Sequence, residues 1–453
     1  MEKPSVKANG RALIPFLIFV VVYLGIGVTL IAQGDPMGFY GFKGPIAVIV
    51  GIIAAFIMNK GTVTEKVDIF IKGCGDANII TMCIIYVLAG AFSVVSKQMG
   101  GVDSTVNLGL TLIPSNFVAA GLFIICCFLS VATGTSVGTI AAVGPIAVGL
   151  AEKSGIPLAL MIAAMVGGAM FGDNLSIISD TTIAATKTQG VDMRDKFRVN
   201  LVLAFPAAIV TVILLLIFGR PTMAPHVKSL DFNLIKVLPY IFVLVSAVAG
   251  LNVFIVLLGG IIFSGCIGMA YGSFDALQWT NHVYDGFSGM FEIFLLSMLT
   301  GGLAYMVTDA GGMEWLLTKI KNTVKSKRSA ELGIGALTLL TDAATANNTV
   351  AIIIDGPIAK EMCEEFNVDP RRSASLLDAF SCVMQGIIPY GAQLLIACSF
   401  TKGLVNPISL IPLLWYPMLL AVVLVLSIFF PFADGYIKKH PWNFNTWQCR
   451  TTV

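Results

Sequence analysis

The segment Thr133–Thr139 reads TGTSVGT and the segment Thr345–Thr349 reads TANNT, and each interrupts an apolar stretch of the chain. The string Gly-Pro-Ile-Ala follows both segments, at 144–147 and at 356–359. The interval between the two leading threonines equals the interval between the two strings. Backbone that leaves a helix inside a membrane needs protein, water or an ion as its hydrogen-bonding partner. Paired interruptions in two corresponding halves are typical of the binding site of a transporter.

The composition is that of a membrane protein. The chain is 57% hydrophobic and 12% charged, whereas soluble domains average roughly 25% charged residues. A length of 453 residues leaves room for about ten to twelve transmembrane segments. We therefore predict an all-α polytopic membrane protein with about 10–12 transmembrane segments, some of them broken helices and re-entrant hairpins. The net charge of +2 and the lack of a basic tail argue against nucleic acid as a partner.

The basic residues predict the orientation of the chain. Lys3, Lys7 and Arg11 precede an apolar run at 12–31 that is too long for a signal-peptide core. Because positive charge favours the cytoplasmic side, we predict a cytoplasmic N-terminus in a multi-pass protein of the plasma (inner) membrane. We interpret the later basic residues as loop charges that set topology, rather than as lipid- or ligand-binding residues; they include Lys60, Lys66, Lys72, Arg194, Lys196, Arg198, Lys319, Lys321, Lys325, Lys327 and Arg328.

The matched interruptions predict an internal repeat, and we call the interval from Thr133 to Thr345 the repeat interval. We expect a first repeat with an N-terminal helix at 1–218, a connecting loop at 219–236 and a second repeat at 237–453. Pro157 and Pro370 follow the two Gly-Pro-Ile-Ala strings. Their separation differs from the repeat interval by one residue, which supports this division. The small residues Gly167 and Gly168 predict a close contact between helices.

A second polar string, Gly172–Thr182, reads GDNLSIISDTT. An aspartate at the centre of a bilayer costs about 2.5–3.5 kcal/mol on insertion scales, and no basic residue follows before Lys187. Hard cations take oxygen ligands, so the string predicts a bound cation; an interfacial loop at the membrane surface is the alternative. The predicted cation ligands are Asp173, Asn174, Ser176, Ser179, Asp180, Thr181, Thr135 and Ser136.

The corresponding stretch of the second half, Gln385–Gln393, reads QGIIPYGAQ and has no carboxylate. We therefore expect the first half to supply most of the negative charge. The second half would then be free to contribute to the binding of another solute. The predicted solute-binding residues come from both halves and are Thr133, Gly134, Asn347, Asn348, Thr349, Pro389 and Tyr390. Asp342 and Asp378 are candidate proton relays, because a buried carboxyl group can hold a proton and release it. Helix capping, or an ion pair with Arg371 or Arg372, is the alternative role for these two aspartates.

These motifs resemble those of the NhaC-type Na+/H+ antiporters. The resemblance rests on TGTSVGT at Thr133–Thr139, on GDNLS and SDTT within Gly172–Thr182, and on VDPRR, LD and IPY at 368–372, 377–378 and 388–390. It implies the ion-transporter superfamily, with two inverted repeats and a homodimer. It also implies that Asp173, Asp180, Thr135 and Ser136 belong to the ion site. Asn174 and Ile177 depart from the lysine and proline that family members often have there.

We therefore predict a sodium-coupled secondary transporter, a Na+/H+ antiporter in the simplest version, with Na+ and H+ as the transported or coupling ions. The alternative is a Na+- or H+-coupled transporter or exchanger of a small organic acid or amino acid. The sequence has no Walker loop and no nucleophile elbow, so we do not expect transport driven directly by ATP. We also expect no enzyme activity. The competing enzyme hypothesis is an intramembrane aspartyl protease. The expected partners are the lipid bilayer, a small ion or organic solute, and a second copy of the chain.

Overall fold

The computed structural model describes residues 7–33, 43–112, 114–177, 179–221, 231–249, 251–444 and 446–449. The described residues form helices almost throughout. The exception is one antiparallel pair of two-residue strands, β1 (Trp442–Asn443) and β2 (Gln448–Cys449). The predicted all-α class is confirmed.

The helices up to Phe218 make up the first half. Their bounds are η1 (Gly10–Leu13), α1 (Ile14–Ala32), α3 (Gly44–Met58), α4 (Val63–Cys74), α5 (Ala77–Gln98), α6 (Gly101–Leu112), η2 (Ser115–Phe117), α7 (Val118–Thr133), α8 (Ser136–Ser154), α9 (Leu158–Leu175), α10 (Asp180–Gln189) and α11 (Met193–Phe218).

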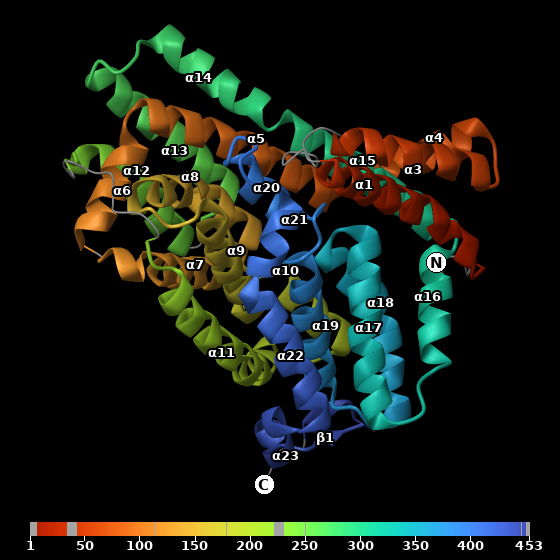
Figure 1. Cartoon of the computed structure of the whole chain (residues 1–453). Coiled ribbons are helices and arrows are strands. Elements are labelled where there is room, and N and C mark those ends of the chain that lie inside the picture. Colours follow the sequence, from red (N-terminus) through yellow and green to blue (C-terminus); the bar gives the residue numbers. More distant parts are fainter. Residues whose placement is uncertain are drawn as a thin grey trace.

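The helices from Leu234 onward make up the second half. Their bounds are α12 (Leu234–Val248), α13 (Val253–Ala270), α14 (Ala276–Gly289), α15 (Phe291–Asp309), α16 (Gly312–Lys321), α17 (Lys327–Thr345), α18 (Asn348–Phe366), α19 (Pro370–Gln385), α20 (Ala392–Ser399), α21 (Pro407–Leu410), η3 (Ile411–Leu413), α22 (Trp415–Phe429), η4 (Phe432–Asp434) and α23 (Gly435–Lys439). In Figure 1, α1, α3, α4, α5, α14 and α15 lie above a body formed by α9, α10, α11, α17, α18, α19 and α22.

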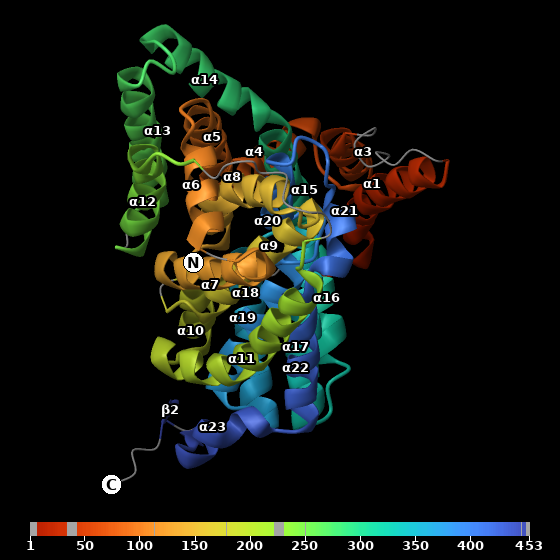
Figure 2. The ribbon, with the colours of Figure 1, turned by 60° about the vertical axis from the view of Figure 1, so that its left-hand side comes forward.

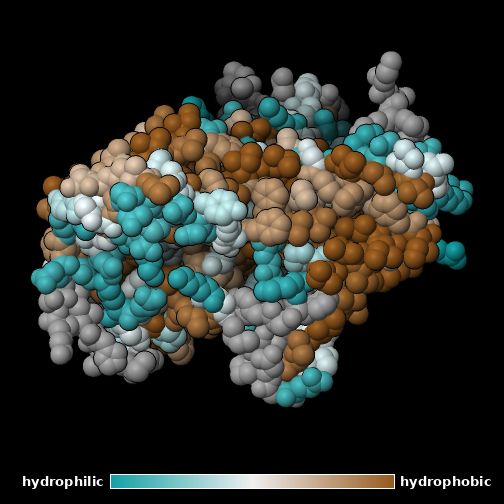
Figure 3. Space-filling view, turned by 90° about the horizontal axis from the view of Figure 1, so that it is seen from above, coloured by the Kyte–Doolittle hydropathy of each residue, from teal (hydrophilic) through white to brown (hydrophobic). Residues whose placement is uncertain are grey.

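Six stretches of the described chain are long and apolar enough to cross a membrane, and a seventh is possible if the bent pair Pro407–Leu413 and Trp415–Phe429 counts as one span. The protein is therefore polytopic, as predicted. The rest of the expected 10–12 segments would have to come from shorter helices. In one apolar segment of 18 residues within Leu158–Gln189, 89% of the residues are buried, whereas the share in the corresponding segment of Met193–Phe218 is 33%. The first therefore lies in the core, and the second presents an apolar surface suited to lipid. Figure 3 shows hydrophobic side chains over much of one face of the molecule.

Helix bounds recur at the repeat interval. α8 begins at Ser136 and ends at Ser154, while α18 begins at Asn348 and ends at Phe366, so both ends are shifted by that interval. The other helices of the two halves follow in the same order, from α3 and α13 to α10 and α20. The inverted orientation of the repeats and their boundaries stay predictions. α12 begins at Leu234, within the predicted connecting loop; residues 222–230 of that loop lie outside the described residues.

The two halves exchange packing partners. α4 packs on α15 and α14 packs on α5, while α10 packs on α18 and α20 packs on α8; Figures 1 and 2 both show α14 lying across α5. The exchange extends to single residues. Glycine has no Cβ atom, and at two positions a larger residue would not fit. If Gly144 carried a Cβ atom, it would lie 2.2 Å from the Phe400 ring, and a Cβ atom added to Gly356 would lie 2.4 Å from Cβ of Thr188. Because Gly356 and Phe400 follow Gly144 and Thr188 by the repeat interval, these contacts are those of a pseudo-two-fold arrangement.

Both polar interruptions end a helix in the same backbone conformation. α7 is followed by Gly134 with φ of 69°, and α17 by Ala346 with φ of 51°. This left-handed region ends many helices, and glycine adopts it without strain. Thr135 and Asn347 then start α8 and α18 as N-cap residues, each accepting a hydrogen bond from the backbone amide three residues on. The predicted interruptions are confirmed as helix breaks.

Glycines allow the helices of the upper layer to cross closely. A Cβ on Gly286 of α14 would lie 2.4 Å from Cα of Ala91, and one on Gly90 of α5 would lie 2.3 Å from the carbonyl oxygen of Gly286. Backbone atoms cannot move aside as the end of a side chain can, so these sites require glycine. Gly168 makes a similar approach between α9 and α7, with its Cβ position 2.3 Å from the carbonyl oxygen of Phe123. The helix contact predicted at Gly167 and Gly168 is thus confirmed.

We predict that Gly286→Ala lowers the free energy of unfolding by about 1–3 kcal/mol, because overpacking forces the two backbones apart. The measurement is thermal unfolding of the purified protein in detergent. Gly289→Ala is the matched control, since it lies in the same helix with nothing within 4 Å of its Cβ position. Equal melting temperatures for the two variants would contradict the close crossing of α5 and α14.

Candidate functional site

The first helix break lies against the end of α9. Asp173, which is only 5% exposed, accepts a hydrogen bond from the Ser136 hydroxyl at 2.6 Å. Gln393 of α20 donates from Nε2 to the same hydroxyl at 3.0 Å. The Oε1 atom of Gln393 is buried without a hydrogen-bond partner among the described residues. The carboxylate therefore lies at the N-terminus of α8, where the helix dipole favours negative charge, and residues from both halves meet there.

A buried ion pair lies beside this carboxylate. Lys196 Nζ is 2.5 Å from Asp378 Oδ2, and both side chains are almost fully buried. Lys196 also donates to the Asn174 carbonyl oxygen and to the Thr182 hydroxyl, each at 2.8 Å. Asn200, one turn further along α11, donates to Asp378 Oδ2 at 3.0 Å. This network joins α9, α10, α11 and α19, and its charges are close enough to Asp173 to act on it.

The network corrects two expectations. Lys196 is not a loop charge that sets topology: α11 begins at Met193, and the side chain of Lys196 is 1% exposed inside the core. The expectation that no basic residue lies near the acidic string is therefore wrong. Lys196 lies beside the string in space, although it follows it by more than ten residues in the sequence. Asp378 pairs with Lys196 rather than with Arg371 or Arg372, because those arginines bind Asp369 and Glu331. Neither Lys196 nor Asn200 was among the predicted site residues.

A second group of carboxylates lies near the second break. Asp342 in α17 and Asp355 in α18 are both fully buried and close enough to interact electrostatically. Asp355 Oδ1 accepts a hydrogen bond from Thr341 at 2.9 Å. The other three carboxylate oxygens of the pair have no hydrogen-bond partner among the described residues. Two ionised carboxylates in such a place repel each other and lack solvation, so they require a proton or a cation.

This second group overturns the expected asymmetry. The second half contributes four buried aspartates among the described residues, at 342, 355, 369 and 378, whereas Asp173 is the buried one from the acidic string of the first half. The expectation was based on aligning the two polar strings, which places Asp173 opposite Gln385. Asp355 was missed, although the sequence offered a signal: it stands alone in the apolar run AIIIDGPIA at 351–359, and an unpaired carboxylate in such a run is costly.

The remaining predicted cation ligands separate into buried and exposed groups. Ser176 donates to the Val131 carbonyl oxygen at 2.8 Å, and Ser179 bonds the hydroxyls of Thr181 and Thr182. Ser176 therefore ties the end of α9 to α7, and Ser179 caps the start of α10. Asn174 Oδ1 accepts from Asn200 at 2.8 Å, and Thr135 caps α8. Asp180, the first residue of α10, is exposed, so the structure does not bring its side chain to Asp173.

The predicted solute-binding residues lie mainly in the breaks themselves. Thr133 and Gly134 are half-buried between α7 and α8, Asn347 and Asn348 are buried, and Thr349 is half-buried. The Nδ2 atom of Asn347 has no hydrogen-bond partner among the described residues. Tyr390 donates its hydroxyl to the Ala343 carbonyl oxygen at 2.8 Å, and Pro389 is half-buried beside it. The string Gln385–Gln393 therefore does break a helix, and it packs against the end of α17.

Within the described residues, no three His, Cys, Asp or Glu side chains gather as a metal-binding group. A cation at either break would therefore take oxygens from hydroxyl, amide or main-chain carbonyl groups in addition to one or two carboxylates. Such mixed oxygen sets suit hard cations. Both breaks have hydroxyl and amide side chains near their carboxylates, whereas the carbonyl oxygens of Val131 and Ala343 in the last turns of α7 and α17 already accept hydrogen bonds from Ser176 and Tyr390.

Comparison with known proteins gives one family and several distant relatives. A model of the Na+/H+ antiporter family matches residues 6–220 and 227–433. The chain is 26% identical over 400 residues to the malate-2H(+)/Na(+)-lactate antiporter of Bacillus subtilis, covering 81% of this chain and 83% of that protein. It is 24% identical over 340 residues to the Na(+)/H(+) antiporter NhaC of Alkalihalophilus pseudofirmus, covering 68% and 73%.

Two further similarities are weaker. The chain is 22% identical over 425 residues to the arginine/ornithine antiporter ArcD of Halobacterium salinarum, covering 84% of each. Among solved structures, the YdaH transporter of Alcanivorax borkumensis matches with a TM-score of 0.42 and 13% identity, over 94% of this chain and 100% of that chain.

We predict that Lys196→Met lowers the free energy of unfolding by about 3–5 kcal/mol, because it leaves Asp378 buried and unpaired. The double variant with Asp378→Leu should lose less than the two single variants combined. Thermal unfolding in detergent measures all three. Lys153→Met is the control: its pair with Asp103, which is 64% exposed, should contribute less than about 1 kcal/mol. Additive effects at Lys196 and Asp378 would contradict the pairing.

Proposed function

The chain belongs to the Na+/H+ antiporter family, and we propose that it couples the movement of sodium ions to that of protons through the buried carboxylates at its two helix breaks. The family match covers both halves, including both breaks. It bears out the resemblance of the sequence motifs to the NhaC-type antiporters. The observation that carries the site proposal is the burial of Asp173, Asp342 and Asp355 near the breaks, together with three oxygens of Asp342 and Asp355 that lack donors among the described residues.

At the first break, Asp173 would hold the cation together with oxygens around Ser136 and Gln393. The Ser136 hydroxyl donates to the carboxylate and accepts from Gln393 Nε2, so one of its lone pairs remains available. The orphaned Oε1 of Gln393 is a further neutral oxygen ligand. A proton arriving on Asp173 removes the charge that attracts Na+ and turns the carboxyl group into a hydrogen-bond donor. Na+ and H+ therefore exclude each other, which is the requirement for exchange.

At the second break, Asp342 and Asp355 would share a proton or a Na+ ion. One positive charge between two carboxylates removes their repulsion, whereas an empty pair at this depth would be costly. The Thr341 hydroxyl fixes the orientation of Asp355 by its 2.9 Å hydrogen bond. In this proposal Asp342 keeps its predicted role as a proton carrier. Asp378 becomes a positioning residue, since Lys196 already neutralises it.

The finer features of the transporter also remain part of the proposal. We place it in the plasma (inner) membrane with a cytoplasmic N-terminus, because Lys7 and Arg11 precede the first apolar helix. We propose inverted repeats, which the exchanged packing of α4, α5, α14 and α15 supports. A homodimer is proposed from the resemblance to the NhaC-type family.

We predict that Asp173→Asn lowers Na+-dependent proton flux at least about tenfold, because the neutral amide cannot exchange one cation for the other. The measurement is a pH-sensitive dye trapped in proteoliposomes under an imposed Na+ gradient. Asp180→Asn is the matched control: it removes an exposed carboxylate of the same string, and its flux should stay close to that of the wild type. Normal flux in Asp173→Asn would sink the assignment of the first site.

A second candidate function is exchange of a small organic anion or amino acid, coupled to Na+ or H+. Two relatives support it by name, the malate-2H(+)/Na(+)-lactate antiporter and the arginine/ornithine antiporter. Within the chain, Asn347 offers an unpartnered buried amide donor that suits a carboxylate group.

The alternative is tested by thermal shift with malate, lactate, arginine and ornithine, each with and without Na+. A solute that raises the melting temperature only when Na+ is present is expected to favour coupling to that solute, because a bound ligand stabilises the folded state by mass action. Asn347→Leu should remove such a shift. No shift with any of the four solutes would leave Na+/H+ exchange as the function.

A further inference from the structure

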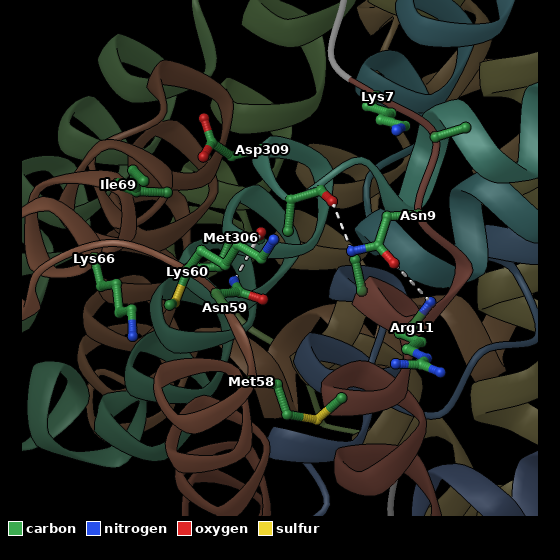
Figure 4. Close-up of a pocket in the computed structure, with 13 residues that line it drawn as sticks. Lys7, Asn9, Arg11, Met58, Asn59, Lys60, Lys66, Ile69, Met306 and Asp309 are labelled. Carbon is green, nitrogen blue, oxygen red and sulfur yellow. Dashed lines mark hydrogen bonds between the residues drawn. The ribbon is translucent and has the colours of Figure 1, made fainter.

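A cavity of about 800 Å³ lies away from both helix breaks, at the N-terminal end of the described chain. Its walls come from η1, from the turn between α3 and α4, and from the end of α15. Two side-chain bonds join these walls: Asn9 donates to the Ala310 carbonyl oxygen at 3.3 Å, and Asn59 donates to the Met306 carbonyl oxygen at 3.4 Å. Figure 4 shows both bonds. The cavity is therefore formed by structure that is tied together across the chain.

The residues that line the cavity are strongly basic. Among them are Lys7, Arg11, Lys60 and Lys66, against one carboxylate, Asp309. Lys66 donates to the Phe56 carbonyl oxygen at 2.8 Å and so has a structural role. The ion pairs of the described residues involve other side chains. Four basic side chains thus gather around one hollow whose lining holds a single carboxylate, and this excess of positive charge creates a site of positive potential.

The corresponding turn of the second half lacks two of these lysines. Lys60 and Lys66 correspond to Gly272 and Gln278 at the repeat interval. Those two residues lie just before α14 and within it, in the same place relative to the repeated helices. The second half therefore builds its corresponding turn without these two cations. This difference calls for a role that belongs to the first half alone.

An exposed apolar surface lies beside the cavity. α4 begins three residues after Lys60, and its Val63, Val67 and Ile71 are 69%, 37% and 58% exposed. Their spacing of four residues places them on one face of the helix. Ile57, at the end of α3, is 77% exposed. An amphipathic helix with an apolar face next to basic groups is typical of a segment that lies in the membrane interface.

We propose that the cavity binds the phosphate headgroup of an anionic phospholipid, whose acyl chains lie along the apolar face of α4. The positive charges of Lys7, Arg11 and Lys60 recognise the phosphate, and the exposed side chains Val63, Val67 and Ile71 contact the chains. Basic pockets between membrane helices bind anionic headgroups in this way. A free phosphate would use the charges alone, so the apolar face favours the lipid as the source of the anion. The proposal is independent of the ion site.

The test uses the purified full-length protein in detergent and follows its melting temperature. The probes are a short-chain phosphatidylglycerol, the phosphatidylcholine of the same chain length, and inorganic phosphate at the same concentration. The variant is the double substitution Arg11→Gln and Lys60→Gln. The matched control is Lys438→Gln with Lys439→Gln, two exposed lysines of α23 that do not line the cavity.

We expect phosphatidylglycerol to raise the melting temperature several degrees more than phosphatidylcholine does. We expect the double variant at Arg11 and Lys60 to lose at least half of that difference and the control variant to retain it. The difference should also shrink as salt is raised, because salt screens surface charge. Equal shifts with both lipids, an equal shift with phosphate alone, or the same loss in the control variant would each overturn the proposal.

Discussion

The structure depends on the need to satisfy backbone groups where a helix stops inside a protein surrounded by lipid. Such a helix end can persist only where other parts of the chain supply the partners. α7 and α17 both stop in this way, each with one residue in the left-handed region. The next residues, Thr135 and Asn347, replace the lost bonds with caps. Each break also has buried carboxylates near it, which is why both cation sites are proposed at the places where a helix stops.

In each half, a glycine of one helix packs against a phenylalanine of the next, but the helix that carries the glycine differs between the halves. In the first half, Gly168 of α9 packs on Phe123 of α7; in the second, Gly335 of α17 packs on Phe380 of α19. At the repeat interval, Gly335 corresponds to Phe123 and Phe380 corresponds to Gly168. The glycine of one half therefore occupies the position of the phenylalanine in the other. Close packing fixes the total volume at a crossing, not which helix carries the bulk. This freedom explains why the repeat is clear in the helix bounds and faint in the residues.

The sequence predicted the features that local chemistry determines. Composition identified the helical membrane class, and glycine, threonine and asparagine marked both breaks to within a residue or two. It also placed Asp173 at a buried position. The pairing of side chains across the chain could not be read, because it depends on tertiary contacts. Lys196 looked like a loop residue among Arg194 and Arg198, yet it is the partner of Asp378. Asp355 had an unusual apolar setting but no motif, and Asp180 matched a motif although its side chain faces outward.

The exchanged packing of the halves also constrains how the chain folds. α8 needs α20, and α18 needs α10, to cover the buried faces around the breaks. During synthesis, about half of the chain is therefore made after α8 and before α20. Until then, Ser136 lacks the hydrogen bond that Gln393 donates to it beside Asp173. Contacts of such long sequence separation form late and slowly. The last part of the chain thus completes the surroundings of the first break as well as those of the second, and a chain cut before Gln385 would lack contacts at both.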